Sequence, residues 1–126
     1  MAGLLYPELS RRVLGACFAV HNALGPGLLE SAYEGALVIE FQQQGLACER
    51  QAVYPVYYRG QVAGAYIADL VVEGSIILEL KSVRSLTAVM EAQLLNYLRL
   101  SGVPVGYLIN FNGERVVWRR FVCGGG

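Results

Sequence analysis

Long apolar runs are missing from this chain, although 55% of its 126 residues are hydrophobic. No apolar stretch approaches the roughly 20 residues that a membrane-spanning helix needs, so we expect no membrane partner. Only 16% of the residues are charged. A composition this apolar is not typical of disordered proteins. We expect one domain over residues 1–123, with a filled core and a homo-oligomer interface as a further use of apolar surface. The glycines at 124–126 are expected to form a flexible tail.

An excess of charge of either sign is also missing. Ten basic residues balance ten acidic ones, which argues against the basic surplus of a nonspecific nucleic-acid binder. Lysine is nearly absent, because nine of the ten basic residues are arginine and the tenth is Lys81. A single lysine is either chance or a position that needs a compact ammonium rather than a planar guanidinium.

Cysteine and histidine are too few for several familiar sites. Cys17, Cys48 and Cys123 show no metal-ligand spacing, and no signal peptide precedes them, which predicts free thiols in a cytoplasmic protein. His21 is the only histidine, and without a nucleophile elbow it excludes a Ser-His-Asp arrangement. The Gly-Pro-Gly at 25–27 lacks the Gly-Lys-Ser/Thr of a phosphate loop.

Hydrophobic periodicity predicts an α/β fold of order α-α-β-β-β-α-β-β. The predicted helices cover 8–24, 28–44 and 88–100, and the predicted strands cover 50–58, 62–72, 76–81, 105–111 and 115–122. Thr87 is expected to cap the third helix. Because that helix connects the third and fourth strands, these two strands should be parallel, which makes the sheet mixed with helices covering it.

The second and third strands are expected to form a hairpin that gathers charged residues. A turn centred on Gly74 pairs Val72 with Ile76, Leu70 with Leu78 and Asp69 with Glu79. Opposite side chains in an antiparallel pair lie about 5 Å apart at Cβ and point to one face. Lys81 lies two residues beyond Glu79 and therefore on the same face.

Two converging carboxylates repel each other unless one is protonated or a cation lies between them. Oxygen ligands suit Mg²⁺ or Mn²⁺, and a bound metal can activate water while an ammonium orients it or neutralises charge on phosphorus. The alternative is a salt-bridge cluster on the strands. A bulge at the turn would also slip the register by one residue and separate the pair.

Two helices carry further polar candidates. Glu30 lies in the first turn of the second helix with Tyr33 nearby, and it either complements the helix dipole or faces the same site. Gln93, Asn96 and Tyr97 are spaced to form one polar patch on the third helix, or simply its solvated face.

Several blocks in this order resemble the GxxExxY proteins, a family assigned to the PD-(D/E)XK nuclease superfamily. The signature corresponds to Gly27-Leu28-Leu29-Glu30-Ser31-Ala32-Tyr33, and further similarity covers Ala68-Asp69-Leu70, Glu79-Leu80-Lys81, the block 91–98 and Leu108-Ile109-Asn110-Phe111. The resemblance extends from about residue 8 to 122. It implies a restriction-endonuclease-like (PD-(D/E)XK nuclease-like) fold.

The resemblance also implies roles for individual residues. Metal binding would fall to Asp69, Glu79 and Glu30, catalysis to these three with Lys81 and Gln93, and substrate positioning to Tyr97 and Tyr33. The backbone carbonyl of Leu80 is a further metal ligand by analogy. Met90 departs from the pattern, since a polar residue is expected there, and this puts one site-lining contact in doubt.

Two functions follow from these observations. The first is a Mg²⁺- or Mn²⁺-dependent nuclease that hydrolyses phosphodiester bonds of DNA. The second is a non-catalytic module of the same fold that binds nucleic acid or assembles with itself, which the zero net charge and the high apolar content favour.

Overall fold

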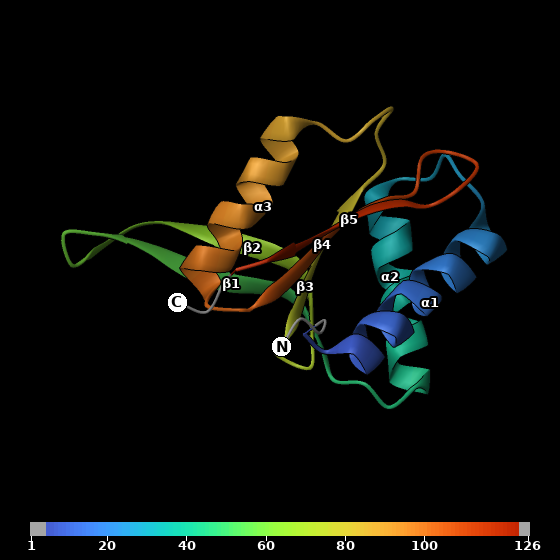
Figure 1. Cartoon of the computed structure of the whole chain (residues 1–126), viewed down its shortest axis with the longest axis horizontal. Helices are drawn as coiled ribbons and strands as arrows, with labels where there is room; N and C mark the ends of the chain where they lie inside the picture. The colour runs from blue at the N-terminus through green and yellow to red at the C-terminus, as the bar shows by residue number, and fades with distance from the viewer. Residues whose placement is uncertain (1–4, 124–126) are drawn as a thin grey trace.

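The protein forms one mixed five-stranded sheet with helices on both faces (Figure 1). The computed structural model describes residues 5–123, so the predicted glycine tail lies outside the described residues. The elements are α1 Pro7–Leu24, α2 Glu30–Gln43, β1 Cys48–Tyr58, β2 Gln61–Val72, β3 Ile76–Lys81, α3 Ala88–Ser101, β4 Val105–Asn110 and β5 Val117–Val122. This order confirms the predicted one. No helix among the described residues is both long and apolar enough to cross a membrane.

The strands follow one another across the sheet in chain order, β1-β2-β3-β4-β5. Neighbouring strands are antiparallel except for β3 and β4, which run parallel from the pair Ile76–Val105 to the pair Lys81–Asn110. The parallel pair confirms the prediction. Helix α3 connects the end of β3 to the beginning of β4, so the two strands run in the same direction.

Local chemistry sets where the helices begin and end. The Thr87 hydroxyl accepts a hydrogen bond from the Met90 amide at 3.2 Å, which caps α3 as expected, and Gly102 ends that helix at φ 75°. Helix α2 begins at Glu30 rather than at 28, because Leu29 is still extended at φ −71° and ψ 153°. The last strand begins at Val117 rather than at 115.

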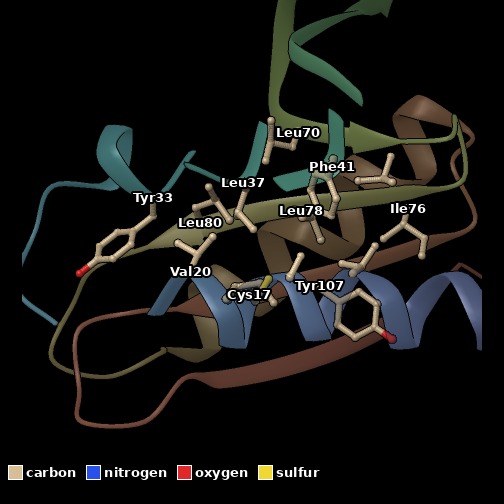
Figure 2. Close-up of a cluster of buried hydrophobic side chains, with 14 of the residues drawn as sticks. Cys17, Val20, Tyr33, Leu37, Phe41, Leu70, Ile76, Leu78, Leu80 and Tyr107 are labelled. Carbon is tan, nitrogen blue, oxygen red and sulfur yellow. The ribbon is translucent and has the colours of Figure 1, made fainter. Parts of the chain in front are cut away.

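Two apolar clusters cover the two faces of the sheet. The first, here called the α1/α2 cluster, contains Cys17 and Val20 of α1 and Leu37 and Phe41 of α2 against Leu70, Ile76, Leu78 and Leu80 of the sheet (Figure 2). The second, here called the α3 cluster, contains Leu94 and Leu98 of α3 against Ala52, Tyr66, Ala68, Val71 and Ile77. The three cysteines are free thiols, as predicted.

Candidate active site

The candidate site lies where β2 and β3 separate. Their ladder runs through the predicted pairs Val72–Ile76 and Leu70–Leu78 and ends at the second pair. Beyond it, side chains bridge the two strands in place of the predicted Asp69–Glu79 strand pairing. The Asp69 amide donates to Glu79 Oε2 at 3.1 Å, and the Leu80 amide donates to Asp69 Oδ2 at 2.8 Å. Each carboxylate thus accepts a backbone hydrogen bond from the opposite strand, and the two acids lie side by side.

A distortion in β1 accompanies this separation. The ladder between β1 and β2 pairs Arg50 with Leu70 and Ala52 with Ala68, but it omits the pair between them. Gln51, which stands opposite Asp69 there, has the left-handed dihedral φ 54°. Residues without a glycine's freedom rarely adopt this conformation, so the neighbouring structure must hold it.

The side chains of β2 change faces at the same point. Tyr66 and Ala68 belong to the α3 cluster, whereas Leu70 and Val72 belong to the α1/α2 cluster. Strict alternation would place all four on one face. The shift at Asp69 therefore brings Tyr66 to the face that carries Glu79, and the Tyr66 hydroxyl donates to Glu79 Oε2 at 2.8 Å.

Burial disfavours the charged form of Glu79. This burial raises the pKa of Glu79 to about 7, and the charge of Asp69 adds to the rise. The hydrogen bonds from the Tyr66 hydroxyl and the Asp69 amide oppose the rise, because they stabilise the charged carboxylate. Burial and the charge of Glu79 also raise the pKa of Tyr66, so that its hydroxyl remains a donor.

Asp69 is perturbed in the same direction. Burial raises its pKa first of all, and the hydrogen bond from the Leu80 amide opposes this. The carboxylates of Glu34 and Glu30 raise the pKa of Asp69 further, while the Lys81 ammonium lowers it. Two acids therefore act on Asp69, and Asp69 in turn acts on Glu79, which is the electrostatic setting in which a cation binds favourably.

Lys81 supplies the positive charge at this position. The ammonium lowers the pKa of both Asp69 and Glu79, so its charge acts on each of them. It forms no ion pair with any other described residue between 5 and 123. Lys81 is the only lysine and Asp69 the only aspartate of the chain, and they lie at one site.

One oxygen of each strand carboxylate remains available. The hydrogen bonds engage Asp69 Oδ2 and Glu79 Oε2, whereas Oδ1 and Oε1 have no partner among the described residues. No side-chain oxygen that is fully buried in residues 5–123 lacks a hydrogen bond, so these two oxygens reach solvent.

This donor set fits Mg²⁺ or Mn²⁺ with water completing the coordination. Mg²⁺ is commonly held by one or two carboxylates and keeps several waters. In the described part of the chain, no three side chains of His, Cys, Asp or Glu are grouped so that they could hold a metal ion. Asp69 and Glu79 are thus the carboxylates that could hold such an ion, with the Leu80 carbonyl as a further donor by analogy, and ligation by Glu30 stays a prediction.

Glu30 joins α2 to the segment that follows Lys81. Its Oε2 accepts a hydrogen bond from the Ser82 amide at 3.1 Å, and the Ser82 hydroxyl donates to the Leu28 carbonyl at 2.9 Å. The carboxylate is close enough to raise the pKa of Asp69. In this arrangement Glu30 anchors the end of β3 and adds negative charge beside the two strand acids.

Helix α3 contributes Tyr97, whose ring stacks on Tyr66 with centroids 3.6 Å apart. Tyr97 is thereby connected to Glu79 through the Tyr66 hydroxyl. Gln93 lies one turn earlier on the same helix face and is exposed. Tyr97 therefore lies against the tyrosine that binds Glu79, whereas a place for Gln93 beside the carboxylates stays a prediction.

Tyr33 lies elsewhere, in the α1/α2 cluster (Figure 2). It is fully buried and stacks on Phe111 with centroids 4.4 Å apart. Its hydroxyl donates to the Gly25 carbonyl at 2.6 Å and accepts from the Leu28 amide at 3.1 Å. The side chain therefore holds the loop before Glu30 and offers no surface that a substrate could contact.

Two residues that the sequence interpretation left out belong to the site. Nothing in the sequence indicated Tyr66, because its spacing of three from Asp69 predicts the opposite face of a regular strand. Helical spacing could have indicated Glu34, since it follows Glu30 by one turn. It is buried, accepts hydrogen bonds from Arg50 at 2.6 Å and Gln51 at 2.8 Å, and so holds the distorted part of β1.

Comparisons with known proteins agree with this fold. A family model described as the PD-(D/E)XK nuclease superfamily matches residues 7–121. Among solved structures, the chain is similar to one described as the crystal structure of SSO0001, with a TM-score of 0.56 and 19% sequence identity. The match covers 93% of this chain and 59% of that one, and at this identity it bears on the fold alone. No curated protein matches the chain.

Proposed function

The chain belongs to the PD-(D/E)XK nuclease superfamily, and from this premise we propose that it is a metal-dependent nuclease that hydrolyses phosphodiester bonds of DNA. Within the superfamily, we propose that it is one of the GxxExxY proteins. The observation that carries the function is the pair of solvent-reaching oxygens on Asp69 and Glu79 beside Lys81, which has no ion-pair partner among residues 5–123.

Asp69 and Glu79 would hold Mg²⁺ or Mn²⁺ through these oxygens. When bound, such an ion lowers the pKa of a coordinated water and offsets negative charge on a phosphate. The protein's contribution is to hold the two acids together before a cation arrives. The Asp69 and Leu80 amides and the Tyr66 hydroxyl do this, since each fixes one carboxylate oxygen and leaves the other free.

Lys81 would act on the reacting groups. A lysine at this position can orient the attacking water, it can accept the proton of that water when it is a neutral amine, or as an ammonium it can neutralise charge that develops on the phosphate. Its charge acts on both Asp69 and Glu79, and this position beside the two acids suits the neutralisation of charge on the phosphate.

The remaining residues would support the site. We propose that Glu30 completes the acidic environment and fixes the segment after β3 through Ser82. Gln93, exposed on α3, would position groups of the substrate, and Tyr97 would keep Tyr66 aligned by stacking. A cytoplasmic location and a homo-oligomeric state are part of the same proposal, and the three free thiols are those expected in a reducing compartment.

The test is hydrolysis of labelled DNA with Mg²⁺, with Mn²⁺ and with a chelator. We expect Glu79→Gln and Lys81→Ala each to lose about 100-fold or more in rate, the usual effect of removing one preorganised charge-stabilising group. Glu114→Gln is the matched control, because it makes the same change on an exposed glutamate in the loop between β4 and β5. Equal hydrolysis by all four proteins, or activity that ignores the chelator, would exclude the proposal.

A non-catalytic module that binds nucleic acid or assembles with itself is the second candidate. The zero net charge favours it, as does the absence of a three-residue metal cluster among the described residues. It predicts that the wild-type protein forms a complex with DNA, or a discrete oligomer, without any metal-dependent cleavage.

A further inference from the structure

The β1–β2 hairpin extends beyond the body of the protein. In Figure 1 its green tip projects to the left, clear of the three helices. The side chains near the tip are large and exposed, with Tyr57 and Tyr58 each at 64%. Arg59 is the only charged residue between 53 and 67. A projecting arm with aromatic groups and almost no charge needs a partner that binds through contact with rings.

One face of this arm carries a row of tyrosines. Burial along β1 alternates from Ala52 to Val56, and Ala52 and Tyr54 pack toward α3. The same alternation assigns Tyr58 to this face. The register shift after Val56 leaves the extra residue on β2, and the alternation of β1 continues to the tip. The Arg59 guanidinium lies 5.3 Å from the centroid of the Tyr58 ring.

The row connects to the candidate active site. Tyr54 stacks on Tyr66 with centroids 5.9 Å apart, and Tyr66 stacks on Tyr97 at 3.6 Å. The Tyr66 hydroxyl donates to Glu79 at 2.8 Å. Stacked rings therefore connect Tyr54 to a carboxylate of the site, and Tyr58 lies about 14 Å farther along the strand at ~3.4 Å per residue, beyond Val56.

We propose that this tyrosine row is a stacking track for single-stranded nucleic acid, which it delivers to the carboxylates. The inference rests on the proposed function, because it names the substrate class of that same site. Every unpaired base has a face that can stack on an aromatic ring, whereas the bases of an intact duplex cover one another. Arg59 adds a cation at the outer end, where it can contact a phosphate.

The low charge of the arm favours a single strand over duplex DNA as the partner. Binding to a duplex relies on many Lys and Arg contacts to phosphates and falls steeply as salt rises. The arm carries only one arginine between residues 53 and 67. The affinity for a single strand should therefore fall only slightly as salt rises, as expected for about one phosphate contact. Stacking supplies the remainder of the affinity and shows little sequence preference.

Tyr57 provides a matched control within the arm. It neighbours Tyr58 and has the same exposed fraction of 64%, but alternation directs it to the opposite face. Replacing either side chain with alanine removes the same amount of exposed aromatic surface at the same distance from the fold's core. Only the Tyr58→Ala change removes a member of the track.

The experiment is fluorescence anisotropy with a labelled single-stranded oligonucleotide of about 15 nucleotides, within the range of known single-strand sites. DNA and RNA versions and the corresponding duplex are titrated separately in a chelator, so that no hydrolysis occurs. We expect Tyr58→Ala to weaken single-strand binding about tenfold, Tyr57→Ala to change it less than twofold, and the duplex to bind more weakly than the single strand.

Equal losses in Tyr57→Ala and Tyr58→Ala, tighter binding to the duplex, or no binding by the wild type would overturn the inference. Thermal unfolding of both variants checks that each is folded. Because binding is measured without metal, the proposed function can fail separately. Metal-dependent hydrolysis together with equal single-strand binding by the two tyrosine variants would keep the nuclease and exclude the track. Weaker binding by Tyr58→Ala alone, without any hydrolysis, would keep only the track.

Discussion

Glu79→Gln should make the metal-free protein more stable at neutral pH. The pKa of Glu79 is raised from 4.5 to about 7, chiefly by burial and then by the Asp69 charge. The folded state therefore holds a proton that the unfolded state releases above about pH 4.5. Stability falls as pH rises through this window, and the fall is complete once Glu79 ionises in the folded state.

The magnitude follows from the size of the shift. A rise from 4.5 to about 7 corresponds to about 3 kcal/mol of unfolding free energy, since one pKa unit is worth about 1.4 kcal/mol. Glutamine keeps an oxygen that can accept from the Tyr66 hydroxyl and the Asp69 amide, but it carries no charge to desolvate. The two proteins should be about equally stable near pH 4.5 and differ by about 3 kcal/mol in favour of the variant near pH 8.

The assay is urea denaturation across this pH range in a chelator, with wild type, Glu79→Gln and the exposed control Glu114→Gln. A constant difference between wild type and Glu79→Gln at all pH values would refute the reasoning, because it would mean that Glu79 ionises normally in the folded protein. The control should follow the wild type. Added Mn²⁺ should remove the advantage of the variant by stabilising the wild type alone.

Two further predictions concern the supports of the site. Tyr66→Phe removes a hydrogen bond to Glu79 worth about 1.5–3 kcal/mol for a charged acceptor. Calorimetry near pH 7 should therefore show Mn²⁺ binding weakened about tenfold, whereas Tyr54→Phe, whose ring stacks on Tyr66, should bind like the wild type. Gly106→Ala would put a Cβ 3.0 Å from Leu98 Cδ2 and 3.1 Å from Leu94 Cδ1, pushing α3 from the sheet. We expect the unfolding free energy from chemical denaturation to fall by about 1–3 kcal/mol. Gly64→Ala is the control, because there is open space around Gly64. Equal stability of the two variants would contradict the packing explanation.

The order of elements could be predicted because the hydrophobic periods and the turn residues agree. Gly74 at φ 63° centres the turn, and the pairs Val72–Ile76 and Leu70–Leu78 follow from it. The parallel pairing of β3 with β4 followed from the helix between them. In these regions local sequence and tertiary structure require the same conformation.

The geometry of the site could be predicted only in part. Spacing put Asp69, Glu79 and Lys81 together, but it implied a regular ladder at Asp69. The left-handed φ of Gln51 is held by tertiary contacts to Glu34, and no local pattern at residue 51 signals it. Without this distortion, alternation assigns Tyr66 to the wrong face.

Tyr33 shows the converse difficulty. Its spacing from Glu30 predicts a shared helix face, and the resemblance to the GxxExxY proteins implied that it positions substrate. Its position is decided instead by packing on Phe111 and by the backbone groups of Gly25 and Leu28 that its hydroxyl satisfies. Burial of a tyrosine with a bonded hydroxyl depends on distant parts of the chain, which spacing along one helix does not report.

Anomalous diffraction at the manganese edge, from crystals grown with Mn²⁺, tests the central claim most directly. We expect an anomalous peak between Asp69 and Glu79, at about 2.0–2.6 Å from the carboxylate oxygens that reach solvent, as for hard divalent cations. An ordered pair of carboxylates with no peak between them at saturating Mn²⁺ would contradict it.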